Sequence, residues 1–396
     1  MPQLYKVNAA RTIDSLVRFW KRKAQDRILI WALVRNPHWD HYLQKHDLPR
    51  NYRVAAPGYA LTYFPEDVPA CETKCLCTEA PERVMEMIDV QQRLCADLED
   101  DSLPIGYPCL HFGESVFSGF AGGAIRFAGN GPYTWSAPEA PVLPDWDKIE
   151  EVLTQPLQDP WRSAFESMAR FAVERAGGRF GLRAFITIDT LNLAVEWRGG
   201  VAAYLDTVDA PDRLERIYRR GVALNHEVML LERTHYDAYN RCLFGDEFCA
   251  LAPAIEKPLL SVDAFTQASP GVYAESGVFY QQQLIDLVGG GHMHMHGTRL
   301  YRFLPLVARL QHLISIELGD DGLQPDEKPP VENIRRIQEE VSGDTPLLVH
   351  CTREQFLEGM HKRTLAGGVA YCVREIADID DANQLVAHAR DYVPRR

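Results

Sequence analysis

Three histidines alternate with methionines in the segment GGGHMHMHG, which spans residues 289–297. On a β-strand alternate side chains share one face, so His292, His294 and His296 are expected to point to the same side. Two imidazoles two residues apart can reach one metal ion, whereas the first and third histidines would lie about 13 Å apart along a fully extended strand. We therefore predict that His294 and His296, at the end of the strand, bind a metal ion.

Further ligands are needed, because a zinc ion takes about four nitrogen, sulfur or oxygen ligands and a catalytic site leaves one position open. Two later apolar runs end in suitable groups: Glu317 lies near the end of HLISIEL, and Cys372 lies near the end of GVAYCV. The run between them ends in His350 and Cys351, which compete for the same position. The residues alone leave open which of these groups completes the site.

These side chains need a scaffold that brings the ends of distant strands together. Eight short apolar runs alternate with helical patterns, and this alternation predicts a parallel sheet with crossover helices. The runs are 27–34, 103–112, 184–190, 259–263, 290–296, 312–318, 346–350 and 368–373. Eight units favour a closed (β/α)8 TIM barrel over an open doubly wound sheet, which remains the alternative. In a barrel the carboxyl ends of all strands meet at one mouth, where catalytic groups gather.

Three regions lie outside the repeating pattern. Residues 10–25 carry apolar side chains at helical spacing, so we expect an N-terminal helical extension over residues 1–26. Residues 35–80 contain several prolines and cysteines and are expected to be irregular. Residues 113–145 are rich in Gly, Pro and aromatic residues, which predicts a long loop over the barrel mouth. No repeat or linker divides the chain, so we expect a single domain over 1–396.

Composition excludes several classes of partner. The formal net charge of −13 argues against nucleic acid and anionic membranes, since both require a basic surface. No apolar run approaches the roughly 18 residues that span a bilayer, and charged residues interrupt the N-terminus where a signal peptide would be apolar. The nine cysteines are scattered and odd in number, so we expect reduced thiols in a cytoplasmic protein. The sequence leaves room for a homodimer.

From about residue 80 onward, the order and spacing of segments resemble the uroporphyrinogen decarboxylase superfamily. Three segments carry this resemblance: LNLAVEWRGGVAAYLDTVDAPDRLERIY (191–218), SVDAFTQASPGVYAESGVFYQQQLIDLVGGGHMHMHG (261–297) and GVAYCVREIADIDDANQLVAHARDY (368–392). Within the superfamily the chain is most similar to the corrinoid-dependent methyltransferases, which bind zinc through a His-x-Cys motif and a later Cys. The decarboxylase itself is less similar, because its arginine-rich N-terminal segment has no counterpart here.

This resemblance implies a zinc-dependent methyltransferase that moves a methyl group between a corrinoid, carried by a separate protein, and a small-molecule acceptor. It places the zinc ligands on His294, on His296 in place of the usual Cys, and on Cys372, with an acidic ligand near Glu317. An imidazole in place of a thiolate makes the ion a stronger Lewis acid. The replacement puts thiol methylation in doubt and leaves room for an oxygen nucleophile or a carboxylate substrate.

The remaining candidates receive roles around the metal. The predicted catalytic residues are Glu317, His350 and Asp189, and the predicted cofactor contacts are His111, Asn192 and Arg198. Two other functions remain open. A decarboxylase or other lyase acting on a carboxylated small molecule would stay active after chelation and would gather arginines in its pocket. A non-catalytic barrel would bind a metal or a corrinoid and leave no open metal position.

Overall fold

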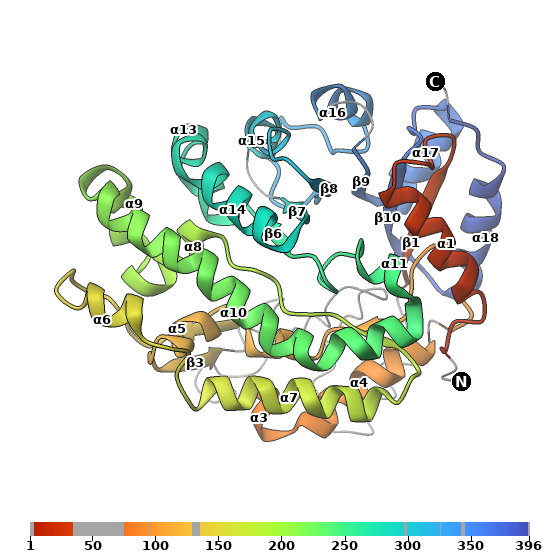
Figure 1. Cartoon of the computed structure of the whole chain (residues 1–396). Helices are drawn as coiled ribbons and strands as arrows, with labels where there is room; N and C mark the ends of the chain where they lie inside the picture. Colours follow the sequence, from red (N-terminus) through yellow and green to blue (C-terminus); the bar gives the residue numbers. More distant parts are fainter. Residues whose placement is uncertain are drawn as a thin grey trace.

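Six parallel strands form the main sheet of the computed structural model, with helices packed outside it (Figure 1). The structure describes residues 4–34, 75–94, 96–128, 135–296, 299–324, 326–341 and 345–394. The sheet order is β1 (Ile28–Val34), β10 (Val369–Ile376), β9 (Leu347–Thr352), β8 (Leu313–Leu318), β7 (Gly291–Met295) and β6 (Leu259–Ser261). Two short pairs complete the strands: parallel β2 (Ile105–Gly106) with β5 (Gly181–Leu182), and antiparallel β3 (Ile125–Ala128) with β4 (Trp135–Pro138).

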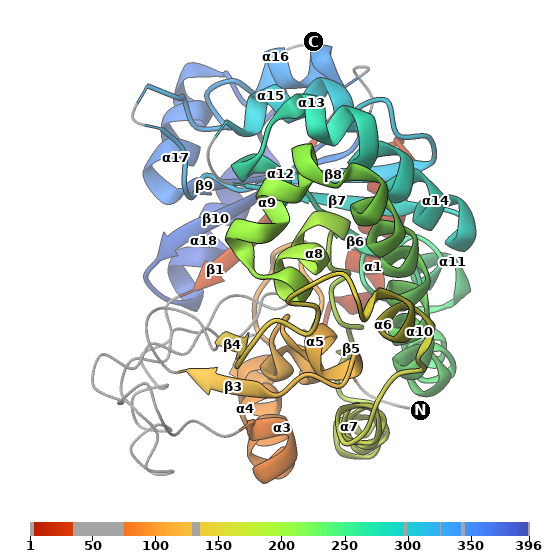
Figure 2. The ribbon, with the colours of Figure 1, turned by 90° about the vertical axis from the view of Figure 1, so that its left-hand side faces the viewer.

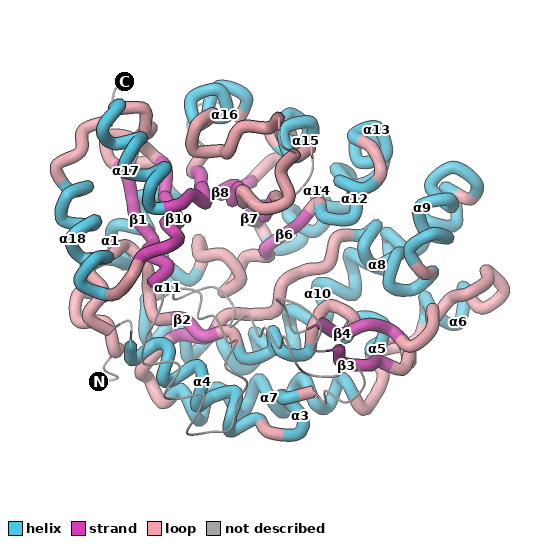
Figure 3. Tube along the Cα trace, turned by 180° about the vertical axis from the view of Figure 1, so that it is seen from behind, coloured by secondary structure: helices cyan, strands magenta, loops and turns pink. Residues whose placement is uncertain are grey.

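The helices surround the strands, as the views from the side and from behind show (Figures 2 and 3). Those of the first half are α1 (Ala9–Trp20), α3 (Leu76–Glu79), α4 (Pro81–Leu94), the 3-10 helix η1 (Pro108–Phe112), α5 (Val116–Phe120), α6 (Ile149–Thr154), α7 (Trp161–Ala176), α8 (Thr190–Arg198) and α9 (Gly200–Asp209). Those of the second half are α10 (Pro211–Phe244), α11 (Asp246–Cys249), α12 (Asp263–Gln267), α13 (Pro270–Val272), the π-helical turn η2 (Tyr273–Gly277), α14 (Val278–Val288), α15 (Leu300–Val307), α16 (Ile334–Glu340), α17 (Arg353–Lys362) and α18 (Ile379–Arg390). None of the helices that the structure describes combines the length and apolar character needed to cross a membrane.

The predicted alternation of strands and helices is confirmed, and the closed barrel is not. Six of the eight predicted runs form the six-stranded sheet. The other two, 103–112 and 184–190, contain or follow strands of only two residues, and the strands of the described residues do not pair into a closed ring. The result is an α/β fold with a parallel sheet, consistent with a TIM-barrel-like arrangement.

Helix α10 explains why the segment 182–188 is not a full strand. Three buried side chains on this helix bond to the segment's backbone: Asn240 with Leu182 (2.9 and 2.7 Å), Glu232 with the Phe185 N–H (2.6 Å) and Asn225 with Ile188 (2.9 and 2.9 Å). The other edge bonds to the chain around β6, where the Ala184 N–H donates to the Ala254 carbonyl (2.6 Å) and the Thr187 N–H to the Leu259 carbonyl (3.3 Å). Side chains of a helix therefore take the place of a neighbouring strand.

Glu232 makes this arrangement sensitive to pH. Burial raises the pKa of Glu232 to about 8, well above the roughly 4.3 of an exposed glutamate. Between these values the folded chain keeps a proton that the unfolded chain has lost, so the free energy of unfolding falls as the pH rises from about 5 to about 8. We expect Glu232→Gln to remove this decline. Between about pH 5 and pH 8 the free energy of unfolding of the wild type should therefore fall relative to that of the variant. Below about pH 4 the free energies of unfolding of the two proteins should change with pH in parallel.

Urea denaturation midpoints of both proteins across this pH range measure the effect. Glu174→Gln, which replaces an exposed carboxylate on α7, is the control and should follow the wild-type curve. Parallel curves for wild type and Glu232→Gln at every pH would contradict the prediction.

A second gap, between β1 and the chain before β2, is closed by carboxylates. The Ile30 N–H donates to Asp101 Oδ2 (3.0 Å), and the Ala32 N–H donates to Asp100 Oδ2 (2.9 Å). The Lys6 ammonium, buried beside them, donates to the Asp100 carboxylate and backbone carbonyl and to the Ser102 carbonyl. The N-terminal segment thereby ties the two edges together through a buried ion pair.

The three regions that lie outside the repeating pattern of strands and helices follow their predictions to different degrees. The predicted N-terminal helix is α1, whose apolar face is buried. Residues 113–145 are not the single long loop that their composition predicts, because they contain the fully buried helix α5 and the β3–β4 hairpin. Of the irregular segment predicted over 35–80, residues 35–74 lie outside the described residues, and α3 begins at Leu76, after Cys75.

Candidate functional site

Glu317 lies between two imidazoles at the carboxyl ends of three adjacent strands. His294 of β7 is its register partner, with Nδ1 3.2 Å from Glu317 Oε2, and His350 of β9 places Nε2 2.8 Å from Glu317 Oε1. The Glu317 carboxylate is almost fully buried. Loss of solvent around the ring lowers the pKa of His294 to about 4, so this imidazole is neutral at neutral pH. Its buried Nδ1 atom is within ion-pair distance but makes no hydrogen bond of acceptable geometry.

His296 has different partners from His294. Its Nδ1 atom lies 2.8 Å from Asp321 Oδ2, and its Nε2 atom lies 3.2 Å from Asp263 Oδ1. The ion pairs with the Asp263 and Asp321 carboxylates raise the pKa of His296 to about 10, and the hydrogen bond with His296 lowers the pKa of Asp321 to about 2. His296 is therefore an imidazolium between two carboxylates, with its ring centroid 4.9 Å from that of His294.

Cys372 lies on the same inner face, one strand beyond His350. The two residues are register partners on β10 and β9, and Trp31 of β1 is the partner of Cys372 on its other side. The Cys372 thiol is fully buried, and burial raises its pKa well above the usual value. Among the residues that the structure describes, no three His, Cys, Asp or Glu side chains are arranged so that they could hold one metal ion.

Asp189 and Asn192 lie at the start of α8 and connect the site to the region before α5. Asp189 caps this helix by accepting from the Asn192 N–H (2.7 Å), and its other oxygen accepts from the Ala264 N–H of α12 (3.1 Å). Asn192 Nδ2 donates to Glu114 Oε2 (2.9 Å). Burial, reinforced by the charge of Asp263, raises the pKa of Asp189 to about 8 and that of Glu114 to about 7.

Arg198, predicted to contact a cofactor, lies in a network at the end of α8. Its Nε donates to Asp206 Oδ2 (2.8 Å), and its guanidinium carbon lies 4.1 Å from the Trp146 ring centroid. Its Nη1 donates to the Leu143 and Pro144 carbonyls (2.7 and 2.8 Å). These contacts hold the chain before α6 against α8, and a contact with a cofactor stays a prediction.

The sequence reasoning missed three carboxylates of this site. Asp263 lies two residues after the end of β6, Asp321 follows β8, and Glu114 lies two residues after the end of η1. The rule that pointed to Glu317, an acidic residue at a strand end, also applies to Asp263 and Asp321. Of the residues predicted from the sequence, His111 has a side chain that lies outside what the structure describes, although its backbone belongs to η1.

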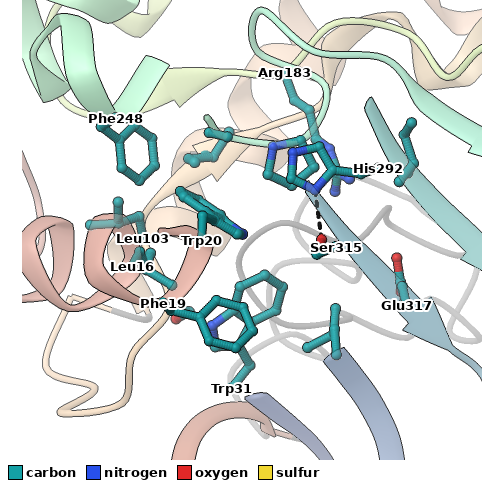
Figure 4. A pocket seen from close by; sticks show the side chains of 16 residues that line it. Leu16, Phe19, Trp20, Trp31, Leu103, Arg183, Phe248, His292, Ser315 and Glu317 are labelled. Atoms are coloured by element: carbon teal, nitrogen blue, oxygen red, sulfur yellow. Dashed lines mark hydrogen bonds between the residues drawn. The ribbon is translucent and has the colours of Figure 1, made fainter. Parts of the chain in front are cut away.

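A cavity of about 60 Å³ lies between strands of the main sheet and helices α1 and α11, next to Glu317 (Figure 4). His292 is part of its wall, and its two ring nitrogens are hydrogen-bonded, Nδ1 with Ser315 Oγ (2.6 Å) and Nε2 with the Leu251 carbonyl (2.7 Å). Burial lowers the pKa of His292 to about 3. The ring is therefore neutral, with Nε2 donating to the carbonyl and Nδ1 accepting from the Ser315 hydroxyl.

The comparison with solved structures gives a match over nearly the whole chain. The fold is similar to that of a methyltransferase from Methanosarcina mazei. The alignment covers 96% of this chain and 98% of that chain, with a TM-score of 0.53 and 11% sequence identity. No protein-family model and no curated protein matches the sequence. At this identity the likeness shows the fold, and the reaction has to be argued from the site.

Proposed function

We propose that the chain is a zinc-dependent methyltransferase that moves a methyl group between a corrinoid on a separate protein and a small-molecule acceptor. The observation that carries this proposal is the convergence of His294 and His350 on the buried carboxylate of Glu317. This cluster lies at the carboxyl ends of parallel strands, where TIM-barrel enzymes carry their catalytic residues. The fold shared with a methyltransferase along almost the entire chain supports the same reaction class.

The donor groups suit zinc by type, and binding would require them to move, because no three of the described groups lie where they could hold one ion. Imidazole, carboxylate and thiol groups project from four adjacent strands, and all three are zinc ligands. His294 is neutral, as a ligand must be, and its buried Nδ1 atom makes no hydrogen bond. The proposed ligands are His294, His296, Cys372 and Glu317. Binding through His296 requires this imidazolium to lose its proton and one carboxylate contact, and His350 is placed to serve instead.

The chain's own groups would position the acceptor and take its proton. A bound zinc ion would supply Lewis acidity that favours the deprotonated acceptor. Glu317 and His350 form a pair that can accept that proton, because the carboxylate stabilises the imidazolium that results. Both side chains are largely shielded from solvent, at 7% and 13% exposure. Asp189 holds α8 and α12 in place around the mouth through its two backbone contacts.

Metal analysis of the purified chain tests the proposal. We expect about one equivalent of zinc per chain, and we expect His294→Ala and Cys372→Ser each to lose most of it. Comparing His296→Ala with His350→Ala decides which imidazole is the second nitrogen ligand. His388→Ala and Cys242→Ser, which replace exposed residues of the same types, should keep the wild-type metal content.

Zinc content that is absent in wild type, or unchanged in both His294→Ala and Cys372→Ser, would overturn the metal site. Activity that survives chelation would instead support decarboxylation or another lyase reaction on a carboxylated molecule.

A further inference from the structure

A second, smaller cavity lies next to Asp189, among helices α8, α10 and α14 and strand β6. Its volume is about 10 Å³, and a single water needs roughly 10–15 Å³ on the same measure. The cavity therefore has room for one water molecule and for no larger ligand.

The lining of this cavity includes three polar side chains that are almost completely buried. Thr190, Asn225 and Gln281 are 4%, 2% and 4% exposed, and they belong to α8, α10 and α14. Apolar cavities stay dry, whereas small cavities that offer two to four polar partners hold ordered water. The number and burial of these polar groups favour a hydrated cavity.

The hydroxyl of Thr190 is the group that indicates a ligand. Thr190 Oγ1 is buried and has no hydrogen-bond partner among the described residues. The methyl group of the same side chain packs toward α10, since a Cβ added at Gly221 would lie 3.3 Å from Thr190 Cγ2. Because an unpaired buried hydroxyl costs free energy, we expect Thr190 Oγ1 to have a partner in the folded protein.

The two amide side chains can complete a water site. Asn225 Nδ2 donates to the Ile188 carbonyl (2.9 Å), and Asn225 Oδ1 accepts from the Ile188 N–H (2.9 Å). Gln281 Nε2 donates to the Ser261 carbonyl (2.5 Å). Each amide nitrogen carries two hydrogens, so each has one N–H that these bonds do not use. A water can accept from such an N–H and donate to Thr190 Oγ1.

We propose that this cavity binds one ordered water molecule, which joins Thr190, the first residue of α8, to α10 and α14. Water fits better than a metal cation, because the amide N–H groups are donors and both Asp189 oxygens already accept from backbone N–H groups. The bound water is a fixed part of the support of α8, the helix that Asp189 caps. The site depends on neither zinc nor methyl transfer.

A high-resolution crystal structure of the full-length wild-type chain, from crystals grown in rubidium chloride, tests the site directly. We expect one water within about 3 Å of Thr190 Oγ1 and within hydrogen-bond distance of at least one more polar group of the lining. A cavity without electron density, or an anomalous rubidium peak inside it, would overturn the proposal.

The stability of Thr190→Val provides a second test, in which the sign of the change depends on the water. Valine has nearly the shape of threonine but lacks the hydroxyl. If water is bound, the substitution removes one of its partners and should lower the urea midpoint. If the hydroxyl is unpaired, the substitution removes a buried unsatisfied group and should raise the midpoint. A midpoint that is unchanged or raised therefore contradicts the water site.

Two further variants serve as controls. Thr190→Ser keeps the hydroxyl and should keep the water peak, whereas Thr190→Val should lose it. Thr234→Val replaces an exposed threonine on α10 and should leave the urea midpoint close to that of wild type.

Discussion

Glu317→Gln is expected to cause the largest functional loss of any single isosteric change in this chain. The substitution keeps the shape of the side chain but removes the charge that faces His294 and His350. As a ligand or as a partner of the ligands, the carboxylate should be worth about 10–100-fold in metal affinity. As a proton acceptor, it should be worth about 100-fold or more in turnover.

Zinc titration and methyl-transfer rates measured on the same preparations separate the two contributions. Glu339→Gln, which changes an exposed glutamate on α16, is the matched control and should behave like wild type. Wild-type metal affinity and turnover in Glu317→Gln would refute both roles.

Part of this site was predictable because the ends of parallel strands lie close together. Side chains at the carboxyl ends of parallel strands meet whatever their distance in sequence, so His294, Glu317 and His350 can be grouped from the sequence alone. The sequence does not show which of these side chains contact each other. Which imidazole contacts Glu317 and which one lies between Asp263 and Asp321 depends on rotamers and on loops beyond the strands.

The sequence predicted the fold correctly where apolar strands pair with each other. The prediction failed where side chains, rather than a neighbouring strand, bond to the backbone. AFITIDT has the pattern of a buried strand, yet its neighbour on one side is α10. The sequence feature that could have indicated this contact is the spacing of Asn225, Glu232 and Asn240, which are seven and eight residues apart on one face of that helix. A sequence pattern shows that such residues share a face, but not that they meet a backbone. The cavity next to Glu317 could not be predicted from the sequence either, because it depends on how side-chain volumes fill the interior.

Lys6→Met is expected to give the largest loss of stability, because Lys6 neutralises the carboxylate that closes the gap beside β1. The exposed fractions of the Lys6 and Asp100 side chains are 2% and 0%. Removing one partner leaves the other as an uncompensated buried charge, which typically costs about 3–5 kcal/mol. Urea denaturation should show this as a lower midpoint, whereas Lys362→Met, at an exposed ion pair on α17, should leave the midpoint unchanged.

The double variant Lys6→Met/Asp100→Asn distinguishes loss of the ion pair from loss of packing. Asparagine can still accept from the Ala32 N–H, so the bond that holds the edge of β1 is kept while the buried charge disappears. If charge is the cause, the double variant should recover much of the stability lost by Lys6→Met, since replacing both members of a buried pair is far milder than replacing one. If the double variant is no more stable than Lys6→Met, the lysine acts through its bonds to the Asp100 and Ser102 carbonyls instead. Either way, the stability of the sheet edge would depend on a residue that precedes the first helix.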